Sequence, residues 1–154
     1  MGIVNNNSII SFWKESLKLF PNKVAIEDNG IYYTYNQIDD LSNRFANHLT
    51  KLHADRNEIF AIYGTKNANY ISCVLALWKL SYAFVPLDSD LPLDRIKYIL
   101  RSGNIRYIIS ELENNSLQKQ CTHILYKDMS MSPSILEKDN ILTGDNIAYI
   151  RSEE

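Results

Sequence analysis

The segment 64–67, with the sequence Gly-Thr-Lys-Asn, has the residue types of an anion-binding turn. It joins a short apolar run to an apolar helical pattern. A strand-to-helix junction presents unpaired backbone N–H groups and the positive end of a helix dipole, where phosphate binds well. The segment contains one glycine, however, and neither GxGxxG nor GxxxxGK[ST]. We therefore expect Asn67 to be an ordinary helix N-cap, and Thr65 and Lys66 to make at most a weak anion contact.

Three histidines and two cysteines are the other residues suited to metal binding or nucleophilic chemistry. His48, His53 and His123 show no metal-ligand spacing with Cys73 or Cys121. Cys73 lies within an apolar helical pattern, where a thiol behaves as a small hydrophobe. The sequence leaves a single disulfide open, but two cysteines do not make a framework. We expect a solvated or edge position for His48, and no catalytic, cofactor-binding or metal-binding residue in the chain.

Charged and aromatic residues near the predicted strands favour structural roles. Asp88 and Arg95 flank a loop, and their opposite charges predict an ion pair that stabilises the fold. Four aromatic residues are expected in the core or at an interface rather than on a substrate platform. They are Tyr33, Tyr35, Tyr82 and Phe84.

The composition is that of one soluble globular domain. The chain has 154 residues, 45% hydrophobic and 22% charged, with a net charge of −2 and a pI of about 5.9. There is no basic surplus to engage the phosphates of a nucleic acid. Residues 1–8 lack the pattern of a signal peptide, and no apolar run approaches the ~20 residues that span a bilayer. We expect a cytoplasmic protein that binds neither nucleic acid nor membrane.

Alternating patterns along the chain predict an α/β fold: a layered, mostly parallel sheet flanked by helices, with an N-terminal β-hairpin. The stretch 78–88 organises it, as a helix end, a turn and a buried strand ending at Pro86. Ser8 is expected to cap the first helix, and Gly103 to be the first residue beyond the fourth. Helices are predicted at 9–20, 36–52, 68–80 and 92–102. The first is expected to have one face of Ile9, Phe12, Trp13, Ser16, Leu17 and Phe20, and the second an inward stripe of Ile38, Leu41, Phe45, Leu49 and Leu52. Strands are predicted at 23–27, 31–35, 58–63, 106–110, 123–127 and 146–150, with a helix or loop at 111–120 and an irregular connection at 128–145.

Two segments carry a resemblance to a known family. Residues 78–88, Trp-Lys-Leu-Ser-Tyr-Ala-Phe-Val-Pro-Leu-Asp, resemble the Leu-Lys-Ala-Gly-x-Ala-Tyr-Val-Pro-Leu-Asp motif of adenylate-forming enzymes. Residues 91–95 follow in register with the family's Tyr-Pro-x-Glu-Arg run. Residues 33–38, Tyr-Thr-Tyr-Asn-Gln-Ile, resemble its Leu-Thr-Tyr-x-Glu-Leu motif. The likeness is greatest to the adenylation domains of nonribosomal peptide synthetases, and implies the N-terminal subdomain of that fold over the single partial domain 1–154.

The chain departs from the family pattern at two places. Leu80 and Ser81 replace an Ala-Gly pair, so the turn that glycine permits is expected to be made differently. The family's strand 147–150 would lead into a Gly-rich loop that holds the ATP phosphates. Here the residues 151–154 are Arg-Ser-Glu-Glu, whose carboxylates would repel a triphosphate. We therefore expect a truncated domain that lacks the phosphate loop.

The resemblance implies an ATP-dependent acid–thiol ligase as the complete enzyme. That enzyme would use ATP and Mg²⁺ to convert an amino or carboxylic acid to an acyl-adenylate, and would transfer it to a carrier thiol. We expect the isolated chain to be inactive and to hold no cofactor. Two alternatives stay open: a non-catalytic interaction or dimerisation module, and half of a split enzyme completed by a partner polypeptide.

Overall fold

A parallel four-stranded sheet forms the centre of the computed structural model, which describes residues 9–135. The strand order is β4-β3-β5-β6, and each neighbouring pair is parallel. The central strand β3 buries three consecutive residues, as expected for a strand covered on both faces. The strands are β3 (Ile59–Tyr63), β4 (Ala83–Leu87), β5 (Tyr107–Ser110) and β6 (Thr122–Leu125). The predicted α/β fold with a mostly parallel sheet is confirmed.

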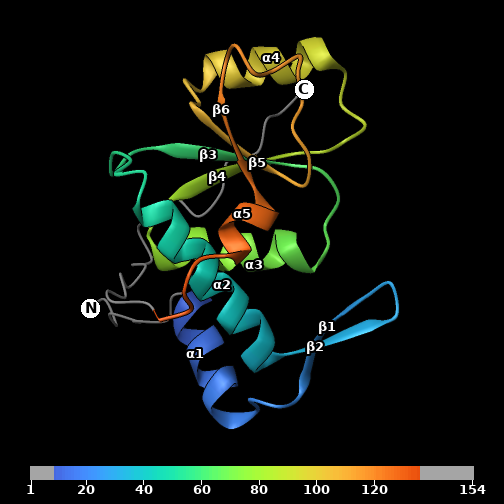
Figure 1. The fold of residues 1–154 in the computed structure, drawn as a ribbon, viewed down its shortest axis with the longest axis vertical. Coiled ribbons are helices and arrows are strands. Elements are labelled where there is room, and N and C mark those ends of the chain that lie inside the picture. The colour runs from blue at the N-terminus through green and yellow to red at the C-terminus, as the bar shows by residue number, and fades with distance from the viewer. Residues whose placement is uncertain (1–8, 136–154) are drawn as a thin grey trace, which may run out of the picture.

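Helices cover both faces of this sheet (Figure 1). One face packs on α4 through a cluster that includes Ile96, Leu100 and Ile108. The other packs on α2, α3 and α5 through Phe45, Phe60 and other buried residues. The helices are α2 (Tyr35–Thr50), α3 (Ala68–Lys79), α4 (Leu93–Ser102) and α5 (Tyr126–Ser130).

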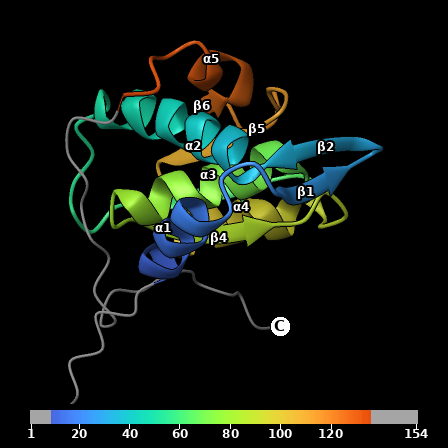
Figure 2. The same ribbon diagram turned by 90° about the horizontal axis from the view of Figure 1, so that it is seen from below.

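Helix α1 (Ile9–Leu19) and the hairpin of β1 (Val24–Asp28) and β2 (Ile31–Thr34) form an outer layer against α2 and α3 (Figures 1 and 2). The hairpin is antiparallel, as predicted. Its turn places Asn29 at φ 51° and Gly30 at φ 80°, two successive left-handed residues that match the twist of the strands.

The predicted inner face of α1 is partly wrong. The pattern placed Ile9, Phe12 and Phe20 on the apolar face together with Trp13, Ser16 and Leu17. In the structure Ile10 is buried, whereas Ile9, Phe12 and Phe20 are about half exposed. The apolar side of α1 is therefore wider than the surface of α2 and α3 that covers it.

Helix α2 begins one residue earlier than predicted. The Thr34 hydroxyl accepts a hydrogen bond from the Gln37 N–H at 3.2 Å, and the Thr34 N–H donates to the Gln37 side chain at 2.8 Å. This reciprocal capping box starts the helix at Tyr35, which the sequence had placed in the preceding strand. The buried residues Ile38, Phe45 and Leu49 confirm the predicted inward stripe.

Helix α3 ends in a turn that uses Ser81 where glycine would be expected. Ser81 has φ 62°, its N–H donates to the Trp78 carbonyl, and the Tyr82 N–H donates to the Leu77 carbonyl. This is the Schellman pattern that usually has glycine at this position. The expectation of a differently made turn is therefore wrong, because the serine adopts the left-handed conformation itself.

Helix α4 ends at Ser102, as predicted, and its closing turn has the same hydrogen-bond pattern. Gly103 has φ −87° and is the C-cap, while Asn104 takes the left-handed position at φ 48°. A Cβ at Gly103 would lie 3.1 Å from the Ile105 side chain, a tight contact that this side chain would have to relieve by moving slightly. Pro92 is correspondingly the N-cap and not a residue of the first helical turn.

The segment after β5 corrects the last part of the prediction. The polar stretch 111–120 forms turns, and β6 ends at Leu125. Tyr126 and Lys127, predicted as strand, instead begin the short helix α5, which extends into the predicted irregular connection. The buried Tyr126 and Met129 lie on one side of α5. A helix of five residues is too short for its apolar pattern to be distinguished from that of a strand. The predicted Ser8 cap, the strand 146–150 and the residues 151–154 lie outside the described residues.

Candidate functional site

Three loops meet beyond the carboxyl ends of the parallel strands, where open α/β sheets bind ligands. The first follows β3 and turns at Gly64, whose φ of 122° strongly favours glycine. The Gly64 N–H donates to the Leu87 carbonyl at 3.0 Å, which fixes this loop against the end of β4. The Asn69 amide reaches the Glu111 carboxylate, beyond β5, at 3.5 Å. The carboxyl-end edge of the sheet is therefore a candidate ligand site.

The N-terminus of α3 lies at this edge, and its N–H groups are already occupied by the protein. The Asn67 side chain accepts from the Tyr70 N–H at 2.9 Å, which confirms Asn67 as an N-cap. The Ala68 N–H donates to the Asp28 carboxylate at 3.0 Å. Asp28 comes from the hairpin turn, so a carboxylate of the chain takes the position in which an anion would bind. The sequence had placed Asp28 only in a turn.

The weak anion contact predicted at this helix end stays a prediction. Thr65 and Lys66 are both exposed, ahead of the cap. Asp88 is exposed after β4, and the Arg95 guanidinium lies 5.5 Å from the centre of the Tyr98 ring. The Asp88–Arg95 ion pair stays a prediction.

A buried lysine forms the most complete polar cluster in the described residues. The Lys79 Nζ donates to Asp39 at 2.7 Å, to Ser42 at 2.8 Å and to the Asn43 carbonyl oxygen at 2.6 Å. The Trp13 indole N–H also donates to Asp39, at 2.9 Å. Lys79 is only 3% exposed, so its ammonium group is held by three acceptors and has no room for a substrate.

This cluster joins α1, α2 and α3 at one point, and its role is structural. One feature of the sequence indicates this cluster: Lys79 occupies the lysine position of the 78–88 motif, inside an otherwise apolar helix end. A lysine in that environment needs an acidic partner. Asp39, on the predicted helix 36–52, could have been proposed on that basis.

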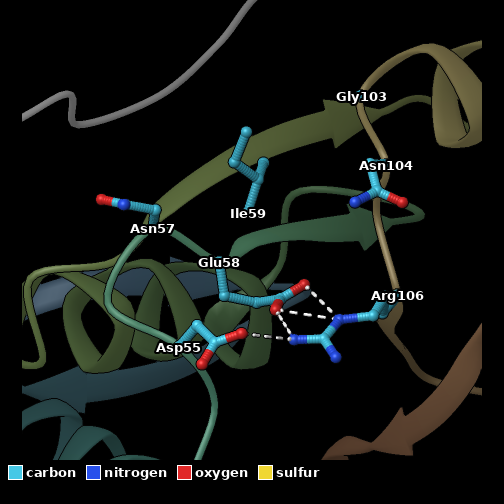
Figure 3. A pocket seen from close by; sticks show the side chains of 7 residues that line it. All are labelled: Asp55, Asn57, Glu58, Ile59, Gly103, Asn104 and Arg106. Carbon is cyan, nitrogen blue, oxygen red and sulfur yellow. Dashed lines mark hydrogen bonds and ion pairs between the residues drawn. The ribbon is translucent and has the colours of Figure 1, made fainter.

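A polar cavity of about 360 Å³ opens at the opposite, amino ends of β3 and β5 (Figure 3). The Arg106 Nε donates to both oxygens of the buried Glu58 carboxylate, at 3.1 and 3.3 Å, and Arg106 Nη2 bonds Glu58 and Asp55. The Glu58 carboxylate raises the pKa of Arg106 further, so the guanidinium stays charged. These pairs brace the starts of two neighbouring strands. The cavity is lined by Asp55, Asn57, Glu58, Ile59, Gly103, Asn104 and Arg106.

The aromatic residues singled out in the sequence all pack within the fold. Tyr35 lies 5.1 Å from Trp13 between ring centres, and Tyr82 lies edge-on to Phe60 at 5.0 Å. The Tyr82 hydroxyl donates to the Ala54 carbonyl at 2.9 Å. Tyr33 packs against the apolar cluster that contains Ile10, and Phe84 belongs to the one that contains Phe60. This packing agrees with the structural role predicted for them.

Histidines and cysteines are dispersed. Burial, together with the nearby Lys51, lowers the pKa of the half-buried His48. Burial raises the pKa of the Cys73 and Cys121 thiols, so neither is a ready nucleophile. Within residues 9–135 no three His, Cys, Asp or Glu side chains are grouped to hold a metal ion. Nor does that part of the chain contain a helix with the length and apolar character to cross a bilayer.

Comparisons with known proteins agree with the motifs. The sequence pattern of the family described as AMP-binding enzyme matches residues 13–150. The chain is 30% identical over 105 residues to the nonribosomal peptide synthetase sidE of Aspergillus fumigatus, covering 68% of this chain and 5% of that protein. It is 24% identical over 150 residues to surfactin synthase subunit 2 of Bacillus subtilis, covering 96% of this chain and 4% of that protein.

Solved structures share the fold. The N-terminal subdomain of NpsA from Klebsiella oxytoca superposes with a TM-score of 0.79 at 20% identity, covering 92% of this chain and 37% of that one. The nonribosomal peptide synthetase FmoA3, in its AMPPNP-bound form, gives a TM-score of 0.82 at 15% identity, covering 96% of this chain and 16% of that one. The chain thus spans a small part of the length of the proteins it matches.

Proposed function

Because the chain belongs to the AMP-binding enzyme family, we propose that it forms the N-terminal framework of an adenylation domain of the nonribosomal peptide synthetase type. The complete domain would activate an amino or carboxylic acid with ATP to an acyl-adenylate and transfer it to a carrier thiol. The observation that carries this proposal is the family match over residues 13–150. The motif at 78–88 and its relatives among peptide synthetases support it.

The proposal gives the described residues a framework role and no role in handling charge. Adenylate formation depends on positioning phosphates and stabilising developing charge. The amides at the start of α3 are taken by Asn67 and Asp28, and the Lys79 ammonium is enclosed by three acceptors. These two features support a framework role for residues 9–135, and we assign those residues no step of the reaction. ATP and Mg²⁺ belong to the proposed complete enzyme.

Isotope exchange between ATP and pyrophosphate tests this proposal. We expect the purified 154-residue polypeptide to give no exchange with any amino or aryl acid, and to take up no MgATP in calorimetry. We expect exchange to appear when it is combined with a polypeptide that supplies the remainder of an adenylation domain. Substrate-dependent exchange by the polypeptide alone would overturn the framework role. Failure with every complementing polypeptide would argue against the split-enzyme form of the proposal.

An interaction or dimerisation module is the second candidate, and one observation favours it. Phe12 and Leu19 on α1, and Phe20 directly after it, are 54%, 59% and 50% exposed, although large apolar side chains normally turn inward. Light scattering coupled to size-exclusion chromatography would distinguish the two candidates. A stable homodimer that is lost in Phe12→Ser, with no complementing activity, would favour the module. A cytoplasmic location, without nucleic acid or membrane partners, stays a prediction under either candidate.

A further inference from the structure

The segment 126–135 folds back over α2 after leaving the edge strand β6. Its first half is the short helix α5, which packs on α2, and its second half runs across the surface of the same helix (Figures 1 and 2). The contacts that hold its two halves differ in kind. One set is polar and involves the backbone, and the other is apolar and involves the core.

Side chains of α2 hold the second half by its backbone carbonyl groups. The Asn47 amide donates to the carbonyls of Pro133 and Ile135, at 2.5 and 2.6 Å. The Arg44 guanidinium donates to the carbonyl of Ser132 at 3.2 Å. Because these donors contact carbonyl oxygens, the attachment depends on the path of the backbone more than on its side chains.

A third side chain of α2 completes this attachment. Asp40 accepts a hydrogen bond from Ser134 and is also paired with Arg44 Nε at 2.8 Å. Asp40, Arg44 and Asn47 are spaced four and three residues apart, so they lie along one face of the helix. We call these three residues the clasp. Water competes for its hydrogen bonds, because Asp40 and Arg44 are partly exposed.

The first half covers part of the core but is weakly stabilised by itself. The Tyr126 ring stacks on Phe45 with ring centres 5.8 Å apart, and Met129 is fully buried. Helix α5 has only five residues and no side-chain cap, and so short a helix does not persist without tertiary contacts. The Tyr126 hydroxyl is buried and has no hydrogen-bond partner among the described residues, which costs free energy in the closed state.

We propose that residues 126–135 are a detachable cap, held closed by the clasp, that opens as a unit while the sheet stays folded. Opening lets water reach the Tyr126 hydroxyl and uncovers the side of Phe45 against which the ring stacks. The cap is thus a conformational device that controls access to an apolar part of α2, next to the edge strand β6. Regions of this kind have the low local stability from which moving elements are drawn.

Hydrogen exchange of the whole 154-residue chain, read by mass spectrometry, tests this proposal. The N–H groups of Met131 and Ser132 donate to carbonyls of α5 at 3.3 and 3.2 Å, so they report the closed state. In the unmodified chain we expect peptides within 126–135 to exchange at least tenfold faster than peptides of β3 and β5. Equal protection of the cap and these two strands would overturn the proposal.

Two variants should move the cap in opposite directions. Asn47→Ala removes two hydrogen bonds of the clasp, and should speed exchange within 126–135 about tenfold while leaving β3 unchanged. Tyr126→Phe removes the unpartnered hydroxyl and keeps the ring, and should slow exchange there about fivefold. Asn36→Ala, on the same helix but outside the clasp, is the matched control and should change neither. Acceleration of all segments together by Asn47→Ala would show that no separate opening occurs. Acceleration of the cap by Tyr126→Phe would contradict the role given to the unpartnered hydroxyl.

Discussion

Replacing Ser81 by glycine should stabilise the protein, although it removes atoms from the folded state. Ser81 holds the left-handed position after α3 at φ 62°. A residue with a Cβ is disfavoured there by about 1–2 kcal/mol, because the Cβ approaches the following carbonyl oxygen. Glycine has no such contact, but its unfolded chain is more flexible, which returns about 0.5–1 kcal/mol. We expect a net gain of about 0.5–1 kcal/mol.

Thermal unfolding followed by circular dichroism is a suitable assay. For a chain of about 150 residues, a gain of 1 kcal/mol raises the Tm by roughly 2–4 °C. Ser102→Gly is the matched control, since Ser102 is the exposed last residue of α4 and lies within the helix. There glycine should lower stability by about 0.5 kcal/mol. The same substitution is therefore expected to have opposite signs at the two positions.

The turn after α4 provides a second left-handed position for comparison with Ser81. Asn104 occupies the equivalent left-handed position after α4, at φ 48°. Asparagine tolerates this conformation better than serine, because its short polar side chain bonds locally. Asn104→Gly should therefore gain less than Ser81→Gly. A Tm of Ser81→Gly equal to or below that of the unmodified protein would refute the argument from backbone strain.

Two further predictions concern buried charge and pH. Lys79→Met should lower the free energy of unfolding by about 3 kcal/mol, because it leaves the partly buried Asp39 without its cation. The exposed Lys51→Met should change that free energy little. Urea titration compares the two variants, and a loss below about 1 kcal/mol in Lys79→Met would contradict the role of the cluster. Burial lowers the pKa of His48 below its usual value near 6.5, so the folded state binds its proton less readily and should lose stability as the pH falls through that value. The fall in Tm between pH 7.5 and 5.5 should therefore be smaller in His48→Gln than in the unmodified protein. The exposed control His53→Gln should behave like the unmodified protein. An equal fall in Tm in all three proteins would count against this role of His48.

The layers of the fold follow from the sequence, because long apolar patterns carry most of the information. The stripe of Ile38, Phe45 and Leu49 predicted α2 and its buried face, and Asn67 predicted the start of α3. Sequence patterns predicted the secondary structure wrongly where an element consists of only a few residues. Tyr126 suits a strand or a helix, and only its packing on Phe45 places it in α5. The four-residue capping signal Thr-x-x-Gln at 34–37 is present in the sequence and marks the start of α2 correctly.

The candidate site was less predictable than the fold, since it depends on contacts between distant residues. No local pattern indicates that Asp28 reaches the N-terminus of α3, 40 positions away. The Arg106–Glu58 brace depends likewise on the register of β3 beside β5. The apolar residues of α1 are visible in the sequence. Which of them become buried depends on how α1 packs against α2 and α3.

The Lys79 ammonium has a consequence for how the helical layer comes apart. Its three acceptors all come from α2, and the shared Asp39 also receives the Trp13 indole of α1. If one of these helices moved away, a charged or polar group would be left inside without its complement. Partial separation is therefore costlier than complete separation. The three helices should melt in a single all-or-none step, which makes this small polar contact a source of cooperativity for the whole layer.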